Sequence, residues 1–331
     1  DLIGIKSPGS GLQPMYIDQI IGKIAQRNIE KGDFFYESDL KEQISQADPT
    51  TFEFGRPWGI PVRYHDFVSL SNRLHLKFVE FHLSYSDLDL DHEQFFGIQD
   101  SMKFAVHSPE LFKGDHILNL CSLDDDYRSK SVSNLSRVYD EVRKLSSKFP
   151  SQTEPIVTVI NAGGFSTDGF VDASTKQSMY NLVADSLAKV DHTGVCPAIQ
   201  TMPPFPWHFG GQSFHNLFVD PNETARFCEQ HKVFVCLDIS HSQMACTYYG
   251  WNLGEFIRIV GPYVVHIHIS DASGVDGEGV AFGKGDVDIR LTWADLNKYC
   301  PNVPFIPEIW QGHKNNGYGF VEALATLAHH Q

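Results

Sequence analysis

The sequence predicts an α/β fold, a (β/α)₈ TIM barrel over residues 56–331 with a small N-terminal piece in front of it. Three observations support this prediction. Eight apolar runs of strand length follow Trp58, segments with helical spacing lie between several of them, and polar residues collect where the runs end. A doubly wound open sheet is the alternative, but eight strands with intervening helices over this length favour the closed barrel.

The first 50 residues differ from the rest of the chain. SPGSGLQP is rich in turn-forming residues, and a short helix is expected over Met15–Gly22, where the glycine ends it. This piece has too few apolar residues to fold stably alone, so we expect it to dock on another part or to belong to a larger domain. The chain begins at Asp1 without a methionine, which suggests a fragment of a longer protein.

From Trp58 onward the expected strands are short apolar runs with polar ends. They are Gly59–Tyr64, Phe78–Leu83, Lys103–His107, Ile156–Ile160, Pro197–Met202, Phe234–Asp238, Val264–His268 and Val303–Ile309. Apolar residues spaced by three and four predict helices over 132–145, 178–187, 255–260 and 317–329. Between Asp238 and Val264 there is room for a loop and one helix.

Composition limits the function classes. A net charge of −15 argues against binding to a phosphate backbone, so no nucleic-acid partner is expected. Apolar runs fall short of the roughly 18 residues of a membrane span, so no membrane partner is expected either. Six scattered cysteines without a CxxC pair are typical of reduced thiols in the cytoplasm. A homo-oligomer is left open.

Polar side chains stand at the ends of the predicted strands. They are His65, His82, His107, Asn161, Gln200, Asp238 with His241, His266 with His268, and Glu308. One histidine after an apolar run is more often structural than a ligand. In a barrel, however, all the carboxyl ends of the strands meet at one mouth, so the repetition predicts a shared pocket.

Asp238, His268 and Glu308 supply two carboxylates and one imidazole from three neighbouring strands. This set suits a divalent metal, Mn²⁺, Co²⁺, Zn²⁺ or Mg²⁺, with open positions for substrate. His241 is expected to hold substrate or to support Asp238. His266 and His268 share one face of their strand, and the outer one, His268, is the expected ligand.

The motifs Leu237-Asp-Ile-Ser-His241, His266-Ile-His-Ile-Ser-Asp271, Phe282–Asp288 and Pro307-Glu-Ile-Trp310 resemble the xylose-isomerase-like barrels. That family contains sugar and sugar-phosphate isomerases and epimerases, with endonuclease IV as a distant relative. The resemblance implies four metal ligands, which fall on Gln200, Asp238, His268 and Glu308, and makes Glu308 the expected catalytic base together with His241.

Gln200 departs from the family, whose epimerases have a glutamate at this position. A glutamine offers a carbonyl oxygen to a metal but cannot act as a general base. Three alternatives follow: a one-base isomerase, a base drawn from elsewhere such as Glu278 or His107, or a sugar-binding barrel that has lost catalysis.

A second resemblance involves the N-terminal piece. Lys6-Ser-Pro-Gly-Ser-Gly-Leu-Gln-Pro14, Ile20–Lys23 and Arg27–Asp33 resemble part of the antifreeze-like (SAF) domain of sialic acid synthases. The resemblance covers about 40 residues. It implies that residues 1–50 are a partial SAF domain, and that the barrel works in nonulosonic (sialic-type) acid biosynthesis beside a fused or associated synthase domain.

Two loops are expected to contact a small carbohydrate substrate. The glycine-rich, acidic loop from Asp271 to Gly285 allows backbone N–H groups to approach a ligand, or it is merely a flexible connection. The segment after Glu308 offers Trp310, His313 and Lys314. The substrate-binding prediction is therefore His107, His266, Glu278, Trp310, His313 and Lys314.

The leading hypothesis is an enzyme that moves a proton next to a carbonyl with the help of a metal. A binding module without turnover is the second hypothesis. A metal phosphodiesterase of the endonuclease IV kind is the third, and the acidic balance and the missing histidine at Asn161 oppose it.

Overall fold

The computed structural model describes residues 12, 17–21, 25, 27–36, 39, 52–208 and 211–330. The chain divides into two compact units, Asp1–Thr50 and Thr51–Gln331. In the N-terminal unit, α1 (Ile17–Ile20) lies within the predicted helix, whose residues 15, 16 and 22 fall outside the described ones. Arg27 holds a turn together, because its Nε donates to the buried Asp39 at 2.8 Å and its Nη2 donates to the carbonyl of Phe34 at 3.0 Å.

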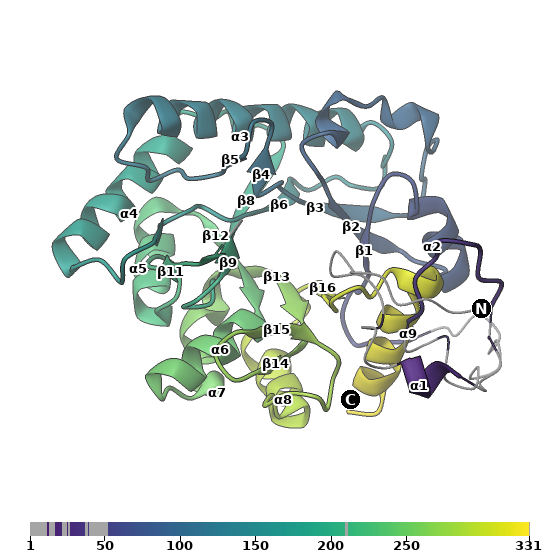
Figure 1. Ribbon diagram of the computed structural model, residues 1–331. Coiled ribbons are helices and arrows are strands. Elements are labelled where there is room, and N and C mark those ends of the chain that lie inside the picture. The colour runs from purple at the N-terminus through teal and green to yellow at the C-terminus, as the bar shows by residue number, and fades with distance from the viewer. Residues whose placement is uncertain are drawn as a thin grey trace. The chain divides into compact units, whose positions relative to one another are not determined.

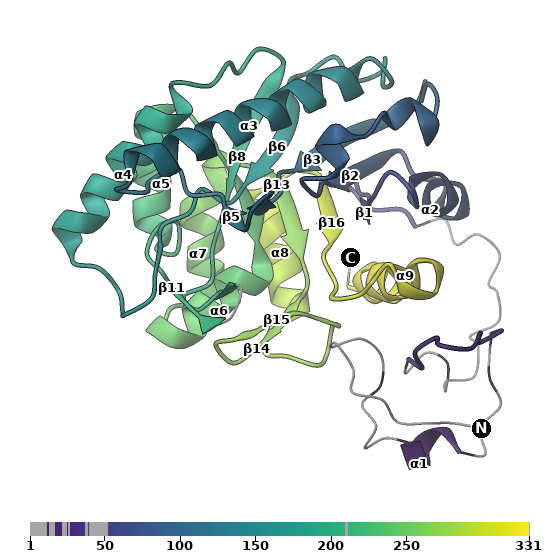
Figure 2. The ribbon, with the colours of Figure 1, turned by 45° about the horizontal axis from the view of Figure 1, so that its top comes forward.

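In the described part of the larger unit, eight parallel strands form one sheet (Figures 1 and 2). In sheet order they are β1 (Pro61–Val62), β2 (Phe78–His82), β3 (Lys103–His107), β6 (Ile156–Ile160), β8 (Val195–Gln200), β12 (Phe234–Asp238), β13 (Val264–Ile269) and β16 (Phe305–Pro307). A parallel bridge between Trp58 and Phe305 joins the first strand region to the last, so the sheet is a nearly closed barrel. The predicted (β/α)₈ fold is confirmed.

The predicted strand bounds agree well where the chain is buried on both faces. The ranges of β3, β6 and β12 are the predicted ones. The strand expected at Pro197–Met202 instead ends at Gln200, because the N–H of Met202 bonds to the carbonyl of Phe218, outside the sheet. β1 and β16 are shorter than predicted.

Helices surround this sheet (Figure 1). They are α2 (Phe67–Leu74), α3 (Asp125–Ser146), α4 (Ala173–Leu187), α5 (Pro221–His231), α6 (Ile239–Tyr249), α7 (Leu253–Val260), α8 (Ile289–Tyr299) and α9 (Lys314–Ala328). The prediction found α3, α4, α7 and α9. It was wrong between Asp238 and Val264, where two helices, α6 and α7, replace the expected loop and single helix.

Side-chain caps explain where six of these helices begin. In each case the side chain before the first turn accepts a backbone N–H, which satisfies a donor that the helix leaves unpaired. The capping residues are Asp124, Asp172, Asp220, Asp238, Asn252 and Asp288. At Asp238 the cap is also the last residue of β12, so strand and helix join without a loop.

Short two-stranded pairings stand in the loops that follow the strands. Hairpins pair β4 (Leu111–Phe112) with β5 (His116–Ile117), β9 (Trp207–His208) with β10 (Gly211–Gln212), and β14 (Asp271–Ser273) with β15 (Gly277–Val280). β7 (Phe165–Ser166) pairs with β11 (Phe214–His215), which lies in the loop of a later strand. The hairpin β14–β15 follows β13 and therefore lies at the carboxyl end of the barrel.

A continuous apolar core fills the space between the strands and the helices, with side chains such as Phe81, Tyr139 and Phe305 fully buried. All six cysteines are free thiols. Among the described helices, none has both the length and the apolar character needed to span a bilayer.

Candidate functional site

Three predicted metal ligands meet at the carboxyl ends of neighbouring strands. Asp238 ends β12 and pairs in register with His268 of β13, and Glu308 directly follows β16. The Nδ1 atom of His268 lies 2.7 Å from Glu308 Oε2 and 3.8 Å from Asp238 Oδ2. One ligand atom from each of the three residues fits within 4.8 Å of the others. Parallel strands bring these side chains together because their carboxyl ends share one edge of the sheet.

Gln200 lies at the same place, on β8. Its Nε2 donates to Asp238 Oδ2 at 3.0 Å and lies 3.1 Å from His268 Nδ1. Its Oε1 lies 3.2 Å from His107 Nε2. The amide N–H thus faces the carboxylate, and the oxygen faces away from the cluster. To bind a metal beside Asp238 and His268, the amide would have to turn over and present Oε1 where Nε2 now lies. That Gln200 is a metal ligand therefore remains a prediction.

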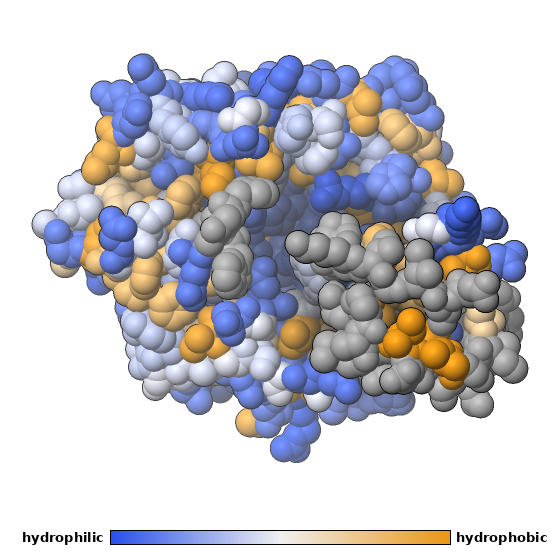
Figure 3. Space-filling view, in the orientation of Figure 1, coloured by the Kyte–Doolittle hydropathy of each residue, from blue (hydrophilic) through white to orange (hydrophobic). Residues whose placement is uncertain are grey.

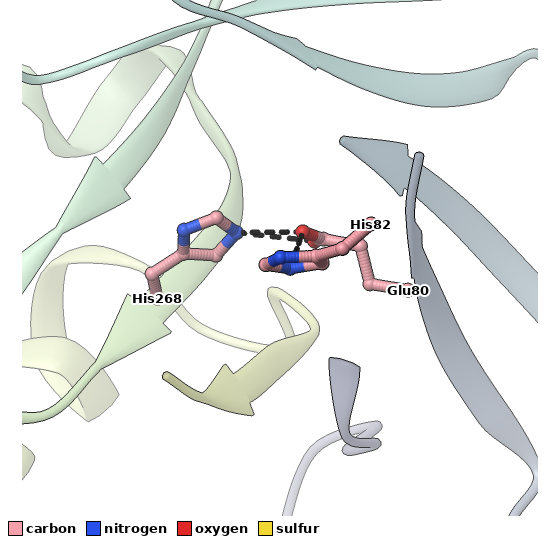
Figure 4. Close-up of side chains that lie close together, drawn as sticks. All are labelled: Glu80, His82 and His268. Carbon is pink, nitrogen blue, oxygen red and sulfur yellow. Dashed lines mark hydrogen bonds and ion pairs between the residues drawn. The ribbon is translucent and has the colours of Figure 1, made fainter. Parts of the chain in front are cut away.

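Sequence reasoning missed Glu80, the middle residue of β2, whose side chain is 0% exposed. Three histidines surround it (Figure 4 shows two of them). His268 Nε2 lies 3.1 Å from both carboxylate oxygens, His82 Nε2 lies 2.8 Å from Oε1, and His266 Nε2 forms an ion pair with Oε2. The only sequence signal was a charged residue inside the apolar run Phe78-Val-Glu-Phe-His82.

Buried charges set the ionisation of this cluster. Burial opposes the charge on Glu80, but His268 and His266 outweigh it and hold the pKa of Glu80 well below its ordinary value. Burial likewise opposes the charge on His268, yet Cys236, Glu80 and Glu308 raise its pKa well above the ordinary value. Burial lowers the pKa values of His82 and His266. In the metal-free protein the buried charge pair is therefore Glu80 with His268.

His241, in the first turn of α6, links Asp238 to the rim of the mouth. Its Nδ1 lies 2.9 Å from the carbonyl of Thr201 and 3.4 Å from Asp238 Oδ2, and its Nε2 lies 3.4 Å from Glu278 Oε2. Burial opposes its charge, but Asp238 and Glu278 raise the pKa of His241 to about 10. His241 is thus an imidazolium held between two carboxylates at neutral pH.

A cavity of about 560 Å³ opens above these residues. In Figure 3 it is the hollow in the middle of the face, whose recessed floor is mostly hydrophilic. Its lining includes eight of the predicted site residues: His107, Gln200, Asp238, His241, Glu278, Glu308, Trp310 and His313. His266, His268 and Lys314 do not line it. His266 is 0% exposed and lies deeper in the barrel against Glu80, where a substrate in the cavity does not reach it.

The glycine-rich loop is folded around a carboxylate and does not aim its N–H groups at the cavity. The buried Asp271 accepts four backbone N–H groups at 2.9 Å, from Ala272 and Val287 on Oδ1 and from Gly283 and Gly285 on Oδ2. A Cβ on Gly285 would lie 2.1 Å from the carbonyl oxygen of Ala272, so the close approach requires glycine. These four bonds join the start of the loop to its end, and the flexible connection stays an untested alternative.

The donor set fits a divalent metal. Asp238 and His268 are buried, Glu308 is partly exposed toward the cavity, and two carboxylate groups with one imidazole are ordinary ligands for Mn²⁺, Co²⁺ or Zn²⁺. Glu80, His82 and His268 form a second compatible group. The two groups share His268 but use opposite ring nitrogens, Nδ1 toward Asp238 and Glu308 and Nε2 toward Glu80.

The fold and the site together define a (β/α)₈ barrel with a carboxylate–histidine centre at its mouth. The family model described as "Xylose isomerase-like TIM barrel" matches residues 69–329, and the SAF domain model matches residues 1–41. The chain belongs to the xylose isomerase-like TIM barrel family. The predicted resemblance of the barrel to this family and that of the N-terminal piece to a SAF domain are confirmed, and the link to sialic acid synthases stays a prediction.

Solved structures share the barrel at low sequence identity. A xylose isomerase domain protein from Planctomyces limnophilus is 16% identical with a TM-score of 0.58, over 85% of this chain and 97% of that one. An L-ribulose 3-epimerase is 13% identical with a TM-score of 0.55, over 81% and 92%. Endonuclease IV from Thermus thermophilus is 15% identical with a TM-score of 0.54, over 83% and 100%. A comparison with curated proteins finds no match.

Proposed function

We propose that the barrel is a divalent-metal-dependent sugar isomerase or epimerase that transfers a proton next to a carbonyl group. The observation that carries this proposal is the meeting of Asp238, His268 and Glu308 below a cavity of sugar size. A metal bound by these three residues would act as a Lewis acid on the sugar carbonyl. Structural likeness to an L-ribulose 3-epimerase adds support at the level of the fold.

Glu308 is the proposed base. His268 lowers the pKa of Glu308, so its carboxylate is ionised and able to accept a proton at neutral pH. Glu308 would remove the proton from the carbon beside the carbonyl, so that the C–H electron pair forms a C=C bond and the π pair of the carbonyl moves onto its oxygen. Return of the proton to the former carbonyl carbon, with transfer of the hydroxyl proton of the neighbouring carbon to the former carbonyl oxygen, would complete an isomerisation.

Epimerisation would need a proton donor on the other face of the sugar. Gln200 cannot supply one, because an amide does not titrate in this range. His241 is the proposed substitute, since it lines the cavity as an imidazolium and Glu278 lies 3.4 Å from its Nε2. A one-base isomerase needs only Glu308. Both routes use residues of this chain that face the cavity.

The charge of the mouth favours an uncharged sugar over a sugar phosphate. Among the described residues, the cavity lining carries five carboxylates, Asp66, Glu110, Asp238, Glu278 and Glu308. Arg63 is the one arginine in that lining, and its guanidinium already lies 3.6 Å from Asp87. A metal would offset Asp238 and Glu308, and the imidazolium of His241 offsets Glu278, but a phosphate would still meet Asp66 and Glu110.

The SAF match at residues 1–41 supports a role in nonulosonic (sialic-type) acid biosynthesis beside a synthase domain. In that setting an amino sugar or N-acyl sugar is the proposed substrate. Trp310, at 74% exposure on the rim, offers an apolar face for the acyl group or the sugar ring.

The test is exchange of the sugar proton with solvent. Purified protein with Mn²⁺ or Co²⁺ is incubated in deuterated water with ketoses, N-acyl hexosamines and their phosphates, and ¹H NMR follows loss of the signal beside the carbonyl. Exchange with a free sugar that disappears in Glu308→Gln supports the proposal. Metal binding without exchange on any of these sugars would instead favour a sugar-binding barrel.

An endonuclease IV-like activity is not proposed. Asn161 donates to Glu110 and offers no imidazole to a further metal, and the acidic mouth opposes a phosphate backbone.

A further inference from the structure

Glu80 is placed to control the imidazole at the metal centre. It lies on β2, whereas its partners His266 and His268 lie on β13, so its side chain reaches across the barrel interior (Figure 4). A carboxylate at 0% exposure costs several kcal/mol unless partners compensate it. An apolar residue would fill this space without that cost. The presence of a buried carboxylate here therefore indicates a role for its charge.

The hydrogen bonds of Glu80 indicate what its charge does. An ionised carboxylate only accepts, and His268 Nε2 lies 3.1 Å from both oxygens of Glu80, so Nε2 must carry the hydrogen. Nδ1 of the same ring lies 2.7 Å from Glu308 Oε2 and near Asp238, and in the metal-free imidazolium it carries a hydrogen as well. A metal held by Asp238 and Glu308 would take the place of that hydrogen, so that only Nε2, which faces Glu80, would remain protonated.

We propose that Glu80 is a positioning residue that fixes the ring orientation and the Nε2–H tautomer of His268, so that Nδ1 is presented to the metal. This proposal rests on the proposed metal centre. Carboxylate–histidine–metal arrangements of this kind raise the basicity of the ligating nitrogen and prevent the ring from turning over. His82 and His266 hold Glu80 in turn, because each places an Nε2 against one of its oxygens.

The chain offers a matched control for this role. Glu141 of α3 is also buried, at 1% exposure, and also contacts a histidine, together with Tyr64 and Lys144. Its Oε1 lies 3.2 Å from His92 Nδ1 and accepts from the Tyr64 hydroxyl at 2.9 Å. Glu141 is absent from the lining of the cavity. Glu141→Gln thus repeats the chemical change of Glu80→Gln at a buried glutamate outside the metal centre.

The experiment measures Zn²⁺ and Mn²⁺ affinity and stoichiometry by calorimetry for wild type, Glu80→Gln and Glu141→Gln, with circular dichroism to check folding. We expect Glu80→Gln to lose roughly 10- to 100-fold in affinity and Glu141→Gln to match wild type. Equal affinity in folded Glu80→Gln would overturn the proposal. So would two metals in wild type and one in Glu80→Gln, which would make Glu80 a ligand.

A second measurement needs no variant to fold. In Zn²⁺-loaded wild type labelled with ¹⁵N-histidine, long-range ¹H–¹⁵N spectra report which nitrogen of His268 carries hydrogen. We expect Nε2–H with Nδ1 on the metal, and Nδ1–H would overturn the proposal. If wild type binds no metal, the proposed function fails together with this inference. If wild type binds metal but Glu80→Gln leaves the metal affinity unchanged, the inference alone fails.

Discussion

Substituting Asp238 should separate two tasks that one carboxylate performs. Its Oδ1 accepts the N–H of His241 at 2.9 Å and so caps α6, and its Oδ2 faces Gln200 and His268 within the proposed metal site. Asparagine retains an oxygen for the cap but removes the charge, whereas alanine removes both. Asp238→Asn therefore tests the metal site with little disturbance of the helix.

The magnitudes follow from these contacts. Loss of an N-cap costs about 1 kcal/mol of unfolding free energy, and the buried Gln200 amide would lose its acceptor at a cost of about 1 to 3 kcal/mol. Asp238→Ala should thus be destabilised by about 2 to 4 kcal/mol. Asp238→Asn should lose less, because the cap remains. Both variants should bind Mn²⁺ more than about 100-fold more weakly, which corresponds to about 2.7 kcal/mol.

Calorimetric titration with Mn²⁺ and urea unfolding of the metal-free proteins measure the two effects. Asp220→Asn is the matched control, since Asp220 caps α5 in the same way but does not line the cavity. It should retain wild-type metal affinity. Wild-type affinity in Asp238→Asn would refute the assignment of Asp238 as a ligand, and equal destabilisation by Asn and Ala would refute its role as a cap.

Three further predictions concern the surroundings of the metal centre. Gln200→Glu should raise Mn²⁺ affinity at least about tenfold yet destabilise the metal-free protein, because a carboxylate would face Asp238 where the amide now lies at 3.0 Å; unchanged affinity in calorimetry would contradict this. Asp271→Asn should lower unfolding free energy by about 2 to 4 kcal/mol, since an amide cannot accept all four N–H groups. In urea unfolding the exposed Asp276→Asn on the same loop should stay near wild type. The pKa of His241 in the folded protein, about 10, lies above the ordinary 6.5. The charged imidazole therefore stabilises the metal-free fold fully below pH 6.5, and this stabilisation is lost as the pH rises through about 10. The stability of His241→Gln, measured against pH, should not show that decline.

The sequence was sufficient for the barrel and for half of the site. Parallel strands that are buried on both faces read as apolar runs, and their carboxyl ends necessarily meet. Asp238, His268 and Glu308 could therefore be predicted to converge without any knowledge of tertiary contacts. The helix α6 could not be found in the same way. Its buried residues, from Ile239 to Cys246, lie around most of its circumference and leave no apolar stripe at helical spacing.

Glu80 and the glycine-rich loop escaped prediction for a shared reason. Glu80 depends on partners that are distant in sequence, and the loop depends on backbone N–H groups, which the sequence does not display. Glu80 meets His268 across 188 residues, and of its three histidine partners His82 alone is near it in the chain. The glycines after Asp271 looked suited to a ligand, but the acceptor they serve is a side chain of their own loop. A sequence pattern indicates which polar groups are available, but not which of them already have hydrogen-bond partners.

The carboxylate of Asp271 has a consequence for binding at the rim. By holding four N–H groups it ties both ends of the segment that carries Glu278, and a further bond joins Gly279 to Trp310, whose N–H donates to the Gly279 carbonyl at 2.7 Å. Ordering a loop of this length when a ligand arrives would cost conformational entropy for every residue fixed. Here these bonds form during folding, so a ligand that enters the mouth meets a wall that is already ordered, and binding does not have to offset that loss of entropy.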